Sequence, residues 1–459
     1  MTVSRDPHED LTELFRLALS ASAVRCEVRE HRSRSSASLW TRLRLLKPGG
    51  SRAIPSIELE VPSPSHRERR TAMNGRAVRR IVRWLVGLVV VAHGAIHLLG
   101  AVKGFGWAEV TQLTQPIGAG LGVVWLVAAV LTMAAGGLLL ARVRWWWMVG
   151  ALAVLASQAV IVTSWTGAQV GTVANVVLAV AVVYGWASQG PRGARAEYRR
   201  RATAALATPN SVDLVTEGDL ARLPAPVAAY VRRSGALGHP RVATLHARFH
   251  GRIRGGPAKP WMTFTGEQVN TFGTQPGRLF LMDAELFGLP VEVLHAFTAG
   301  AATMRVRALS LFPMVDASGP EMDRAETVTI FNDLCILAPA ALIDAPVAWT
   351  LIDDHHVRGA YTYGANTVTA ELSFRDDDEL VDFFSDDRAA VSTDGKTFTP
   401  QRWSTPISGY RDLGSARLGT IGEGHWHAAD GEFAYLEFDL DAIAYNAANL
   451  DHPSAAGGT

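Results

Sequence analysis

Apolar residues dominate a long stretch in the first half of the chain. Between residues 84 and 186 the only charged side chains are Lys103, Glu109, Arg142 and Arg144, and all four lie at breaks between apolar blocks. The blocks at 84–102, 118–140, 145–164 and 171–186 each approach the roughly 20 helical residues that cross a hydrocarbon core. Lipid offers no partner to a free backbone amide, and so few strands could not close into a barrel. The pattern therefore predicts a bundle of four transmembrane helices.

The second half of the chain changes to strict alternation of apolar and polar residues. It occurs in HARFHGRIR (246–254), TMRVRA (303–308), TVTAELSF (367–374) and the segment 433–440. Alternation of this kind is typical of antiparallel strands with one buried face, and GGPAKP, TAGAA and STDGK supply turns between strands. The pattern predicts a large antiparallel sheet.

Two segments of the second half carry helical signals instead. DLARLPAPVAAYVRRSGALG (219–238) predicts a short helix that ends near Gly235. PEMDRAETVTIFNDLCILAP (320–339) begins with Pro320, places carboxylates in its first turns and ends near Pro339. The expected fold class is therefore a four-helix transmembrane bundle followed by an α+β domain, in which a curved antiparallel sheet packs on one or two helices.

These patterns divide the chain into five parts. Residues 73–190 form the four-span domain, 191–208 a basic juxtamembrane linker, and 209–450 the soluble α+β domain. Residues 1–72 mix Arg, Ser and Pro with little periodicity, which predicts disorder or a mis-annotated extension whose true start is Met73. We expect the tail 451–459 to be disordered.

Charge sets the orientation of the predicted spans and excludes one class of partner. Arginines precede the first span, join the second to the third and follow the fourth, whereas the opposite loops offer only Lys103. The positive-inside rule then places both termini in the cytoplasm. The excess of arginine over lysine suggests a GC-rich bacterial genome, so the expected location is a bacterial cytoplasmic membrane. Residues 209–459 carry 19 basic and 32 acidic side chains, a net charge of −13. So acidic a domain argues against nucleic-acid binding. Cys26 and Cys335 are too few for a disulfide framework.

The chain resembles known bacterial families in two places. Residues 73 to about 200 resemble the DoxX-like four-helix membrane proteins. The segments LPAPVAAYVRRSGALG, PWMTFTGEQ, FNDLCILAPAALID, DFFSDDR, QRWSTPISGYRDLG and GEGHWH are similar to an uncharacterised bacterial domain family that is often fused to such spans. The resemblance implies an architecture and no reaction, and it implies a half-barrel sheet like that of bacterial lipoprotein carriers.

Common catalytic signatures are absent from the sequence. It has no phosphate-binding Gly-rich loop, no H-E-x-x-H, no paired C-x-x-C and no G-x-S-x-G. Metal binding is disfavoured for Asp353, Asp354, His355 and His356, because adjacent strand residues point to opposite faces. It is also disfavoured for His425 and His427, which precede a predicted hairpin turn. The sequence therefore predicts no catalytic residue, no metal and no cofactor, and leaves enzymatic activity uncertain.

Aromatic and polar residues of the family-like segments are the best candidates for a ligand site. They are Trp261, Gln268, Asn332, Asp333, Asp387, Arg388, Trp403, Tyr410 and Trp426. A site lined by indoles with few polar anchors suits an apolar or amphipathic ligand. The alternative is a well-packed core in which Asp387 and Arg388 cap a turn or form an ion pair. The basic residues of 246–254 are expected to pair with carboxylates across strands, and contact with anionic lipid or an anionic ligand is the alternative.

Two histidines lie inside the first predicted span. His93 and His97 are four residues apart, so they share one helix face and must point into the bundle. We expect interhelical hydrogen bonds, to Gln158 or Asn175. A haem, metal or quinone site is the alternative.

The sequence thus favours a membrane-anchored binding module for a hydrophobic or lipid-like ligand. A quinone-linked redox accessory protein or enzyme is one alternative, and a structural membrane scaffold is another. Expected partners are the lipid bilayer and a hydrophobic small molecule. A homo-oligomer or another membrane partner is left open.

Overall fold

The computed structural model describes residues 27–31, 40–44, 64–207, 213–392 and 395–451. The chain forms two compact units, Met1–Asn74 and Gly75–Thr459. In the first unit β1 (Glu27–His31) pairs antiparallel with β2 (Trp40–Arg44). The rest of the segment 1–63 and the tail beyond residue 451, where disorder is predicted, lie outside the described residues.

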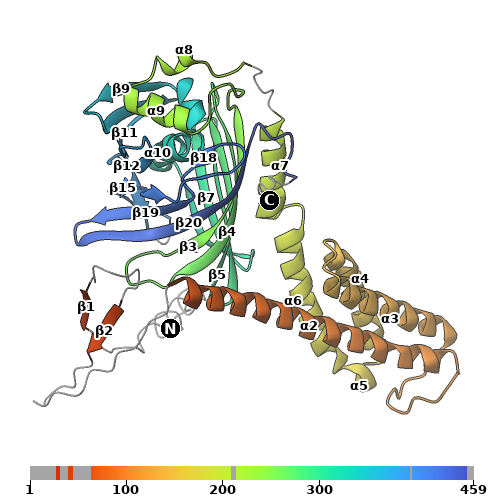
Figure 1. The fold of residues 1–459 in the computed structure, drawn as a ribbon. Coiled ribbons are helices and arrows are strands. Elements are labelled where there is room, and N and C mark those ends of the chain that lie inside the picture. The colour runs from red at the N-terminus through yellow and green to blue at the C-terminus, as the bar shows by residue number, and fades with distance from the viewer. Residues whose placement is uncertain (1–26, 32–39, 45–63, 208–212, 393–394, 452–459) are drawn as a thin grey trace, which may run out of the picture. The chain divides into compact units, whose positions relative to one another are not determined.

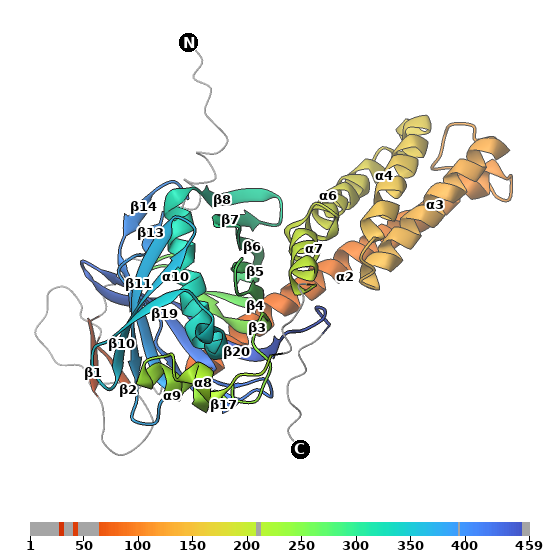
Figure 2. The same cartoon turned by 90° about the horizontal axis from the view of Figure 1, so that it is seen from above.

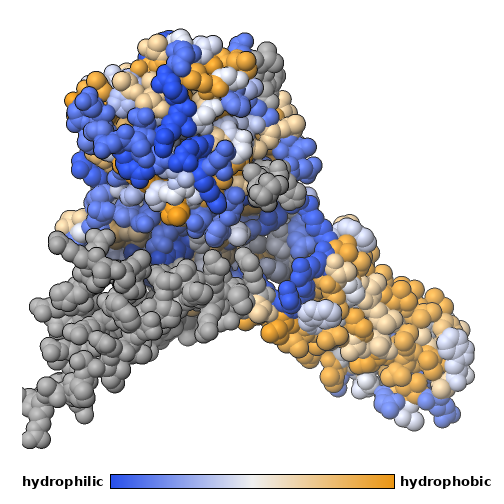
Figure 3. Space-filling model, viewed as in Figure 1, coloured by the Kyte–Doolittle hydropathy of each residue, from blue (hydrophilic) through white to orange (hydrophobic). Residues whose placement is uncertain are grey.

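Four helices are long and apolar enough to cross a membrane, as the hydropathy pattern predicts. The candidate spans are Ala77–Gly104, Ala119–Leu140, Trp146–Thr163 and Gly171–Leu206. They lie in helices α2 (Pro64–Gly104), α3 (Ala119–Leu140), α4 (Trp146–Thr163), α6 (Gly171–Gln189) and α7 (Ala194–Leu206), with α5 (Trp165–Ala168) between α4 and α6. In the view of Figure 3, the surface over α3, α4 and α5 is largely hydrophobic, whereas the surface around α7 is hydrophilic.

Small residues allow the apolar helices to approach one another. A Cβ added to Gly104 of α2 would lie 2.5 Å from the Cα of Gly122 in α3, and one added to Gly100 would meet the Trp125 ring at 2.1 Å. Since lipid is as apolar as the helices, close backbone approach of this kind is a main source of their packing energy.

The sheet domain is a single curved antiparallel sheet that does not close into a barrel (Figure 1). Its strand order is β8-β7-β6-β5-β4-β3-β20-β19-β15-β12-β11-β10-β9, with β16 paired to β19. The first strands are β3 (Thr244–Ile253), β4 (Met262–Thr271), β5 (Gly277–Leu286), β6 (Leu289–Thr298), β7 (Ala301–Ala308) and β8 (Phe312–Ser318). The later strands are β9 (Val347–Leu351), β10 (His356–Tyr363), β11 (Asn366–Phe374), β12 (Leu380–Ser385), β15 (Arg402–Ser404), β16 (Ile407–Ser408), β19 (Ile421–Ala428) and β20 (Gly431–Tyr445).

Short elements complete the domain. β13 (Ala389–Val391) pairs with β14 (Phe398–Pro400), and β17 (Arg411–Asp412) pairs with β18 (Arg417–Leu418). The helices are α8 (Glu217–Leu220), α9 (Ala225–Arg233), α10 (Pro320–Leu337) and the 3-10 helix η1 (Pro339–Ile343). The predicted helices at 219–238 and 320–339 therefore correspond to α8 with α9, and to α10 with η1.

Helix α7 covers the convex face of the sheet, where the sequence suggested only a basic linker. Its Tyr198, Ala202 and Leu206 are fully or almost fully buried and pack on a second core that includes Leu279 and Leu281 of β5. Strands β4 to β6 are thus covered on both faces, whereas the alternation predicted one covered face. The polar residues of the outer face suggest that this face is exposed to water. Helix α7, which is itself rich in arginine, nevertheless packs on this face between them.

Helix α10 lies inside the curve of the sheet and is the centre of the main core (Figure 2). Every residue from Ala325 to Leu337 is buried. Phe331 stacks on Tyr361 with ring centroids 5.4 Å apart, and a Cβ on Gly359 would lie 2.7 Å from the Phe331 ring, so this strand position must be glycine. A helix enclosed in this way holds its polar side chains, Glu326 and Asp333, away from water.

Candidate functional site

Helix α10 covers only one end of the concave face. Near its start, Asp323 accepts a hydrogen bond from the backbone amide of Ala302, the second residue of β7, at 2.6 Å. At its end, the carbonyl of Leu337 accepts from the hydroxyl of Tyr445, the last residue of β20, at 2.6 Å. The helix therefore crosses the end of the sheet where β7 begins and β20 ends. The opposite ends of these strands extend beyond it.

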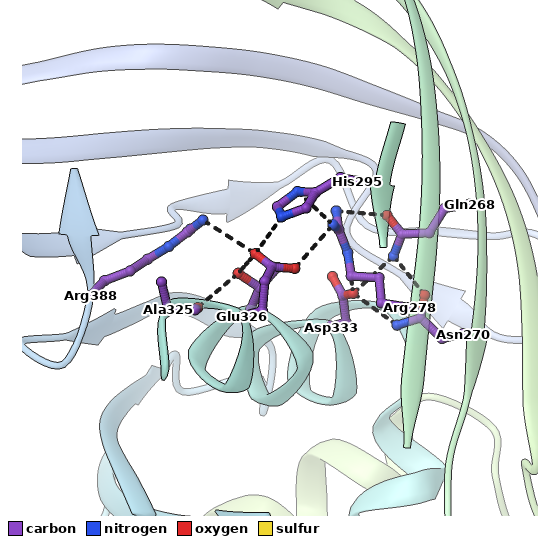
Figure 4. A network of polar contacts seen from close by, with 9 residues as sticks. Gln268, Asn270, Arg278, His295, Ala325, Glu326, Asp333 and Arg388 are labelled. Carbon is purple, nitrogen blue, oxygen red and sulfur yellow. Dashed lines mark hydrogen bonds and ion pairs between the residues drawn. The ribbon is translucent and has the colours of Figure 1, made fainter. Parts of the chain in front are cut away.

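A buried polar network joins α10 to the strands that it crosses (Figure 4). One carboxylate oxygen of Asp333 accepts hydrogen bonds from Gln268 Nε2 at 2.8 Å, Asn270 Nδ2 at 2.8 Å and Arg278 Nε at 3.0 Å. Arg278 also donates to Gln268 Oε1 at 3.1 Å. The ionic group is thus surrounded by donors, as a buried charge requires.

Glu326, two helical turns before Asp333, forms the second half of the network. Its oxygens lie 3.2 Å from His295 Nε2, 3.5 Å from Arg278 Nη1 and 3.9 Å from Arg388 Nη2. Thr329 Oγ1 donates to it at 2.9 Å. Two carboxylates therefore face two guanidinium groups and one imidazole.

In this network burial disfavours the ionised forms of the side chains, whereas neighbouring opposite charges favour them. Burial disfavours the ionised form of Glu326, but contacts with His295, Arg278 and Arg388 outweigh it and hold the pKa of Glu326 below its usual value. Burial raises the pKa of Asp333 in spite of the Arg278 charge. Burial also lowers the pKa of His295 to about 4, so this imidazole is neutral at pH 7.

The pKa of His295 predicts that the sheet domain loses stability in mild acid. Below pH 6.5 the unfolded chain binds a proton at His295 that the folded protein takes up only near pH 4, so stability falls as the pH drops between these values. We expect the thermal unfolding midpoint to decrease from pH 7 to pH 4.5. The variant His295→Gln should show a shallower decrease, and His239→Gln, at an exposed position, should not. Equal slopes for all three proteins would contradict a buried neutral His295.

Arg388 connects the network to two of the candidate indoles. Its Cζ lies 4.0 Å from the centroid of the Trp403 ring and 5.7 Å from that of Trp426, distances typical of cation–π contacts. Trp403 Nε1 donates to Tyr435 at 3.2 Å. Arg388 Nε is buried and has no hydrogen-bond partner among the residues that the structure describes. A donor of this network is therefore unused.

The half of the concave face that α10 does not cross is apolar. The rings of Phe280 and Phe438 lie 6.3 and 5.6 Å from that of Phe249. Cβ atoms on Gly266 and Gly422 would lie 2.7 and 2.4 Å from the Phe280 and Phe438 rings, so both glycines make room for rings lying against the sheet. We call this surface the apolar floor. Other partly buried members are Ile253, Met262, Val293, Met304 and Leu436.

The structure brings five of the nine candidate residues to this region. Gln268 and Asp333 belong to the network, and Arg388, Trp403 and Trp426 adjoin it.

The other four candidates lie elsewhere. Asn332 donates to Thr405 at 2.5 Å, on another side of α10. Asp387 accepts from Thr369 and pairs with Arg324, and does not pair with Arg388. The remaining two candidates make separate contacts, in which the Tyr410 hydroxyl donates to Leu380 O and the Trp261 ring packs under Arg252 and Arg254.

Sequence reasoning missed Asn270, Arg278, His295 and Glu326. A signal existed for Glu326, because residues seven apart lie on one face of a helix, and Glu326 and Asp333 have that spacing in a segment predicted as helical. Arg278 and His295 lie on strands, and the local sequence pattern does not show which strands pack against helix α10.

The other histidine candidates form local contacts. Asp353 Oδ1 accepts from the backbone amides of His355 and His356, each at 2.9 Å, and thus closes a turn. His425 lies between Glu423 and Glu432, at 2.6 and 2.5 Å. Within the described ranges no group of three or more His, Cys, Asp or Glu is arranged to hold a metal ion.

The histidines of α2 take part in a polar cluster between helices. His93 Nε2 lies 3.1 Å from Asn175 Oδ1 in α6 and 3.2 Å from Ser157 Oγ in α4, and His97 Nε2 lies 2.6 Å from the same hydroxyl. Asn175 donates to Gln158 at 2.9 Å. These are the interhelical hydrogen bonds that the sequence favoured, with Ser157 as an additional member.

One family model matches the sheet domain. Residues 213–438 match the model of DUF6544, a family of unknown function. This match does not extend to residues 73–200, so the DoxX-like resemblance has no support from it. A search of curated proteins gives no match.

Two solved structures are similar to part of the chain. One is a putative outer membrane lipoprotein-sorting protein domain from Vibrio parahaemolyticus, with a TM-score of 0.29 and 10% identity over 44% of this chain and 85% of that one. The other is a DUF1329 family protein from Desulfovibrio piger, with a TM-score of 0.29 and 12% identity over 48% of this chain and 92% of that one. TM-scores of this size do not establish a common fold.

Proposed function

We propose that the protein is a membrane-anchored module that binds a hydrophobic or amphipathic, lipid-like ligand on the concave face of its sheet. The observation that carries the proposal is the apolar floor, in which the Phe280 and Phe438 rings remain only partly buried and pack against the buried ring of Phe249. Apolar surfaces bordered by a few polar groups are typical of sites for such ligands.

The polar network gives the ligand an orientation. Arg278 Cζ lies 5.0 Å from the centroid of the Phe280 ring, so the network borders the floor directly. The unused Nε of Arg388 is a donor for a polar group at this border. The ligand would therefore place its apolar part on Phe249, Phe280 and Phe438 and its polar end toward Arg388.

The arginine distribution favours a cytoplasmic sheet domain at a bacterial cytoplasmic membrane. We therefore propose that both termini face the cytoplasm. A reporter fused after Thr459 that is active only outside the membrane would overturn this orientation and leave the ligand proposal untouched.

Ligand binding can be tested with the full chain in lipid nanodiscs. A photoreactive diazirine derivative of a C16 fatty acid is added, and cross-linked peptides are located by mass spectrometry. We expect labelling of β4, β5 and β20. Phe280→Asp places a charge on the floor and should reduce labelling about ten-fold. Thr265→Asp, at an exposed position of the neighbouring strand, is the control. Equal labelling of both variants would reject the floor as the site.

A second candidate function rests on the α2 histidines. His97 Nδ1 and Trp125 Nε1 are both buried without a hydrogen-bond partner in the described structure, and their rings lie 5.3 Å apart. Because Ser157 Oγ donates to Asn175, it accepts from His97 Nε2, so His97 Nδ1 is an acceptor and Trp125 Nε1 a donor. This donor and acceptor at membrane depth could hold a quinone carbonyl and a quinol hydroxyl. Quinone that co-purifies with the full chain and is lost in His97→Phe would support this function, and a quinone-free protein would reject it.

A further inference from the structure

Contacts along α7 show which end of the sheet lies nearer to the membrane helices. Arg195, the second residue of α7, pairs with Asp283 near the end of β5. One and a half turns later, Arg201 donates to Thr298, the last residue of β6, at 2.7 Å. Because β5 and β6 are antiparallel, the turn between them lies at the end that faces α6 and the bilayer.

An ion pair with the first candidate span also places the β5–β6 end of the sheet near the membrane helices. Glu285 of β5 pairs with Arg79, the third residue of the candidate span Ala77–Gly104. The turn that follows begins at Phe287, two strand residues or about 7 Å beyond Glu285. The β5–β6 turn therefore lies at the level where the first span enters the membrane.

The residues at this end are large, apolar and exposed. Phe287 and Leu289, in and after the β5–β6 turn, are 74% and 50% exposed. Phe312 and Met314, after the β7–β8 turn, are each 55% exposed. The two turns are neighbours, because the amide of Leu309 donates to the carbonyl of Pro290 at 2.8 Å. Together these four residues form what we call the rim.

Turn geometry gives no reason for a phenylalanine at this position. Phe287 and Gly288 have φ angles of 51° and 84°, a pair that normally requires Asn-Gly or Gly-Gly. A bulky residue in the left-handed region costs about 1 to 2 kcal/mol. Phe287 occupies the tip of the hairpin in spite of this cost.

We propose that the rim inserts into the interfacial region of the bilayer, so that the ligand passes directly between the membrane and the apolar floor. The floor begins at Phe280, which pairs with Gln268 and His295 of the network, and extends toward the rim end of the sheet through Ile253 and Met262. Val291 and Val293 of β6 continue the apolar surface from Leu289 toward the floor. Bulky apolar side chains at a membrane boundary gain free energy by burial among acyl chains.

Insertion can be measured in the full chain without any ligand. In a Cys26→Ser background, where Cys335 is buried, Phe287→Cys carries an NBD fluorophore in vesicles of phosphatidylcholine and phosphatidylglycerol. Nitroxide-labelled lipid should quench this probe at least about three-fold more strongly than a probe at Ala299→Cys, which lies in the turn at the opposite end of β6. Iodide in the buffer should show the reverse order.

Two outcomes would overturn insertion. One is equal quenching of both probes by nitroxide-labelled lipid. The other is a Phe287→Cys probe that neither lipid nitroxide nor iodide reaches, which would show that protein, such as a second copy of the chain, covers the rim.

Direct exchange rests on the proposed ligand function and has its own measurement. The double variant Phe287→Ser with Phe312→Ser should retain the photoreactive fatty acid at equilibrium but take it up from donor vesicles about ten-fold more slowly. Unchanged uptake would reject the exchange route while leaving ligand binding in place. A wild-type protein that is not labelled would reject the ligand function, whereas the quenching experiment would still report on insertion.

Discussion

Replacing Arg278 with leucine is expected to destabilise the sheet domain by about 3 to 5 kcal/mol. Arg278 is 8% exposed, and its guanidinium lies between Asp333 and Glu326, at 3.0 and 3.5 Å. Without it, two carboxylates remain in the core with few opposing charges. Denaturant unfolding of the full chain, followed by tryptophan fluorescence, measures the change.

A surface pair provides the control for this variant. Arg358 of β10 is exposed and pairs with Glu371 at 3.1 Å, so Arg358→Leu should cost less than about 1 kcal/mol. Adding Asp333→Leu to Arg278→Leu removes one stranded charge and should restore part of the loss. If Arg278→Leu proves as mild as the control, the charges of the network are solvated and the buried arrangement is wrong.

Replacing Asn175 with leucine is expected to destabilise the membrane bundle by about 2 kcal/mol, since each interhelical hydrogen bond contributes about 0.6 kcal/mol or more. Asn175 contacts His93, Ser157 and Gln158, so its loss leaves several polar groups without partners in an apolar environment. Titration with SDS in mixed micelles, followed by helix content, measures this effect.

The neighbouring residue supplies the matched control. Val176 is 57% exposed on the apolar surface of the same helix, and Val176→Leu should change the midpoint little. Equal midpoints for Asn175→Leu and Val176→Leu would show that the cluster does not hold the helices together.

Hydrophobic patterning predicted the elements of this protein well, because each pattern reports a local environment. Lys103, Arg142 and Arg144 lie at the ends of the apolar helices, as charged residues in lipid must. The alternation around Phe249 and Val306 corresponds to β3 and β7, and the carboxylates after Pro320 begin α10.

The same pattern failed where burial depends on a distant segment. Tyr198 is completely buried, yet it stands among arginines that make the region appear exposed. Glu326 and Asp333 are polar residues of a predicted helix, yet both are buried, because the sheet surrounds α10 on several sides. His295 faces them from a strand whose neighbours do not reveal the contact.

The position of β20 has a consequence for folding. Strands β8 to β3 and strands β9 to β12 each follow one another in the chain, so each group can pair locally, whereas β20 pairs with β3 and β19 and joins the two groups. Pairing between such distant segments is slow because a long loop must close first. Until β20 is in place, β3 and β19 present unpaired edges that favour aggregation. A chain interrupted before Gly431 would therefore be a substrate for chaperones and proteases, and the proposed membrane anchor would keep such chains at the membrane.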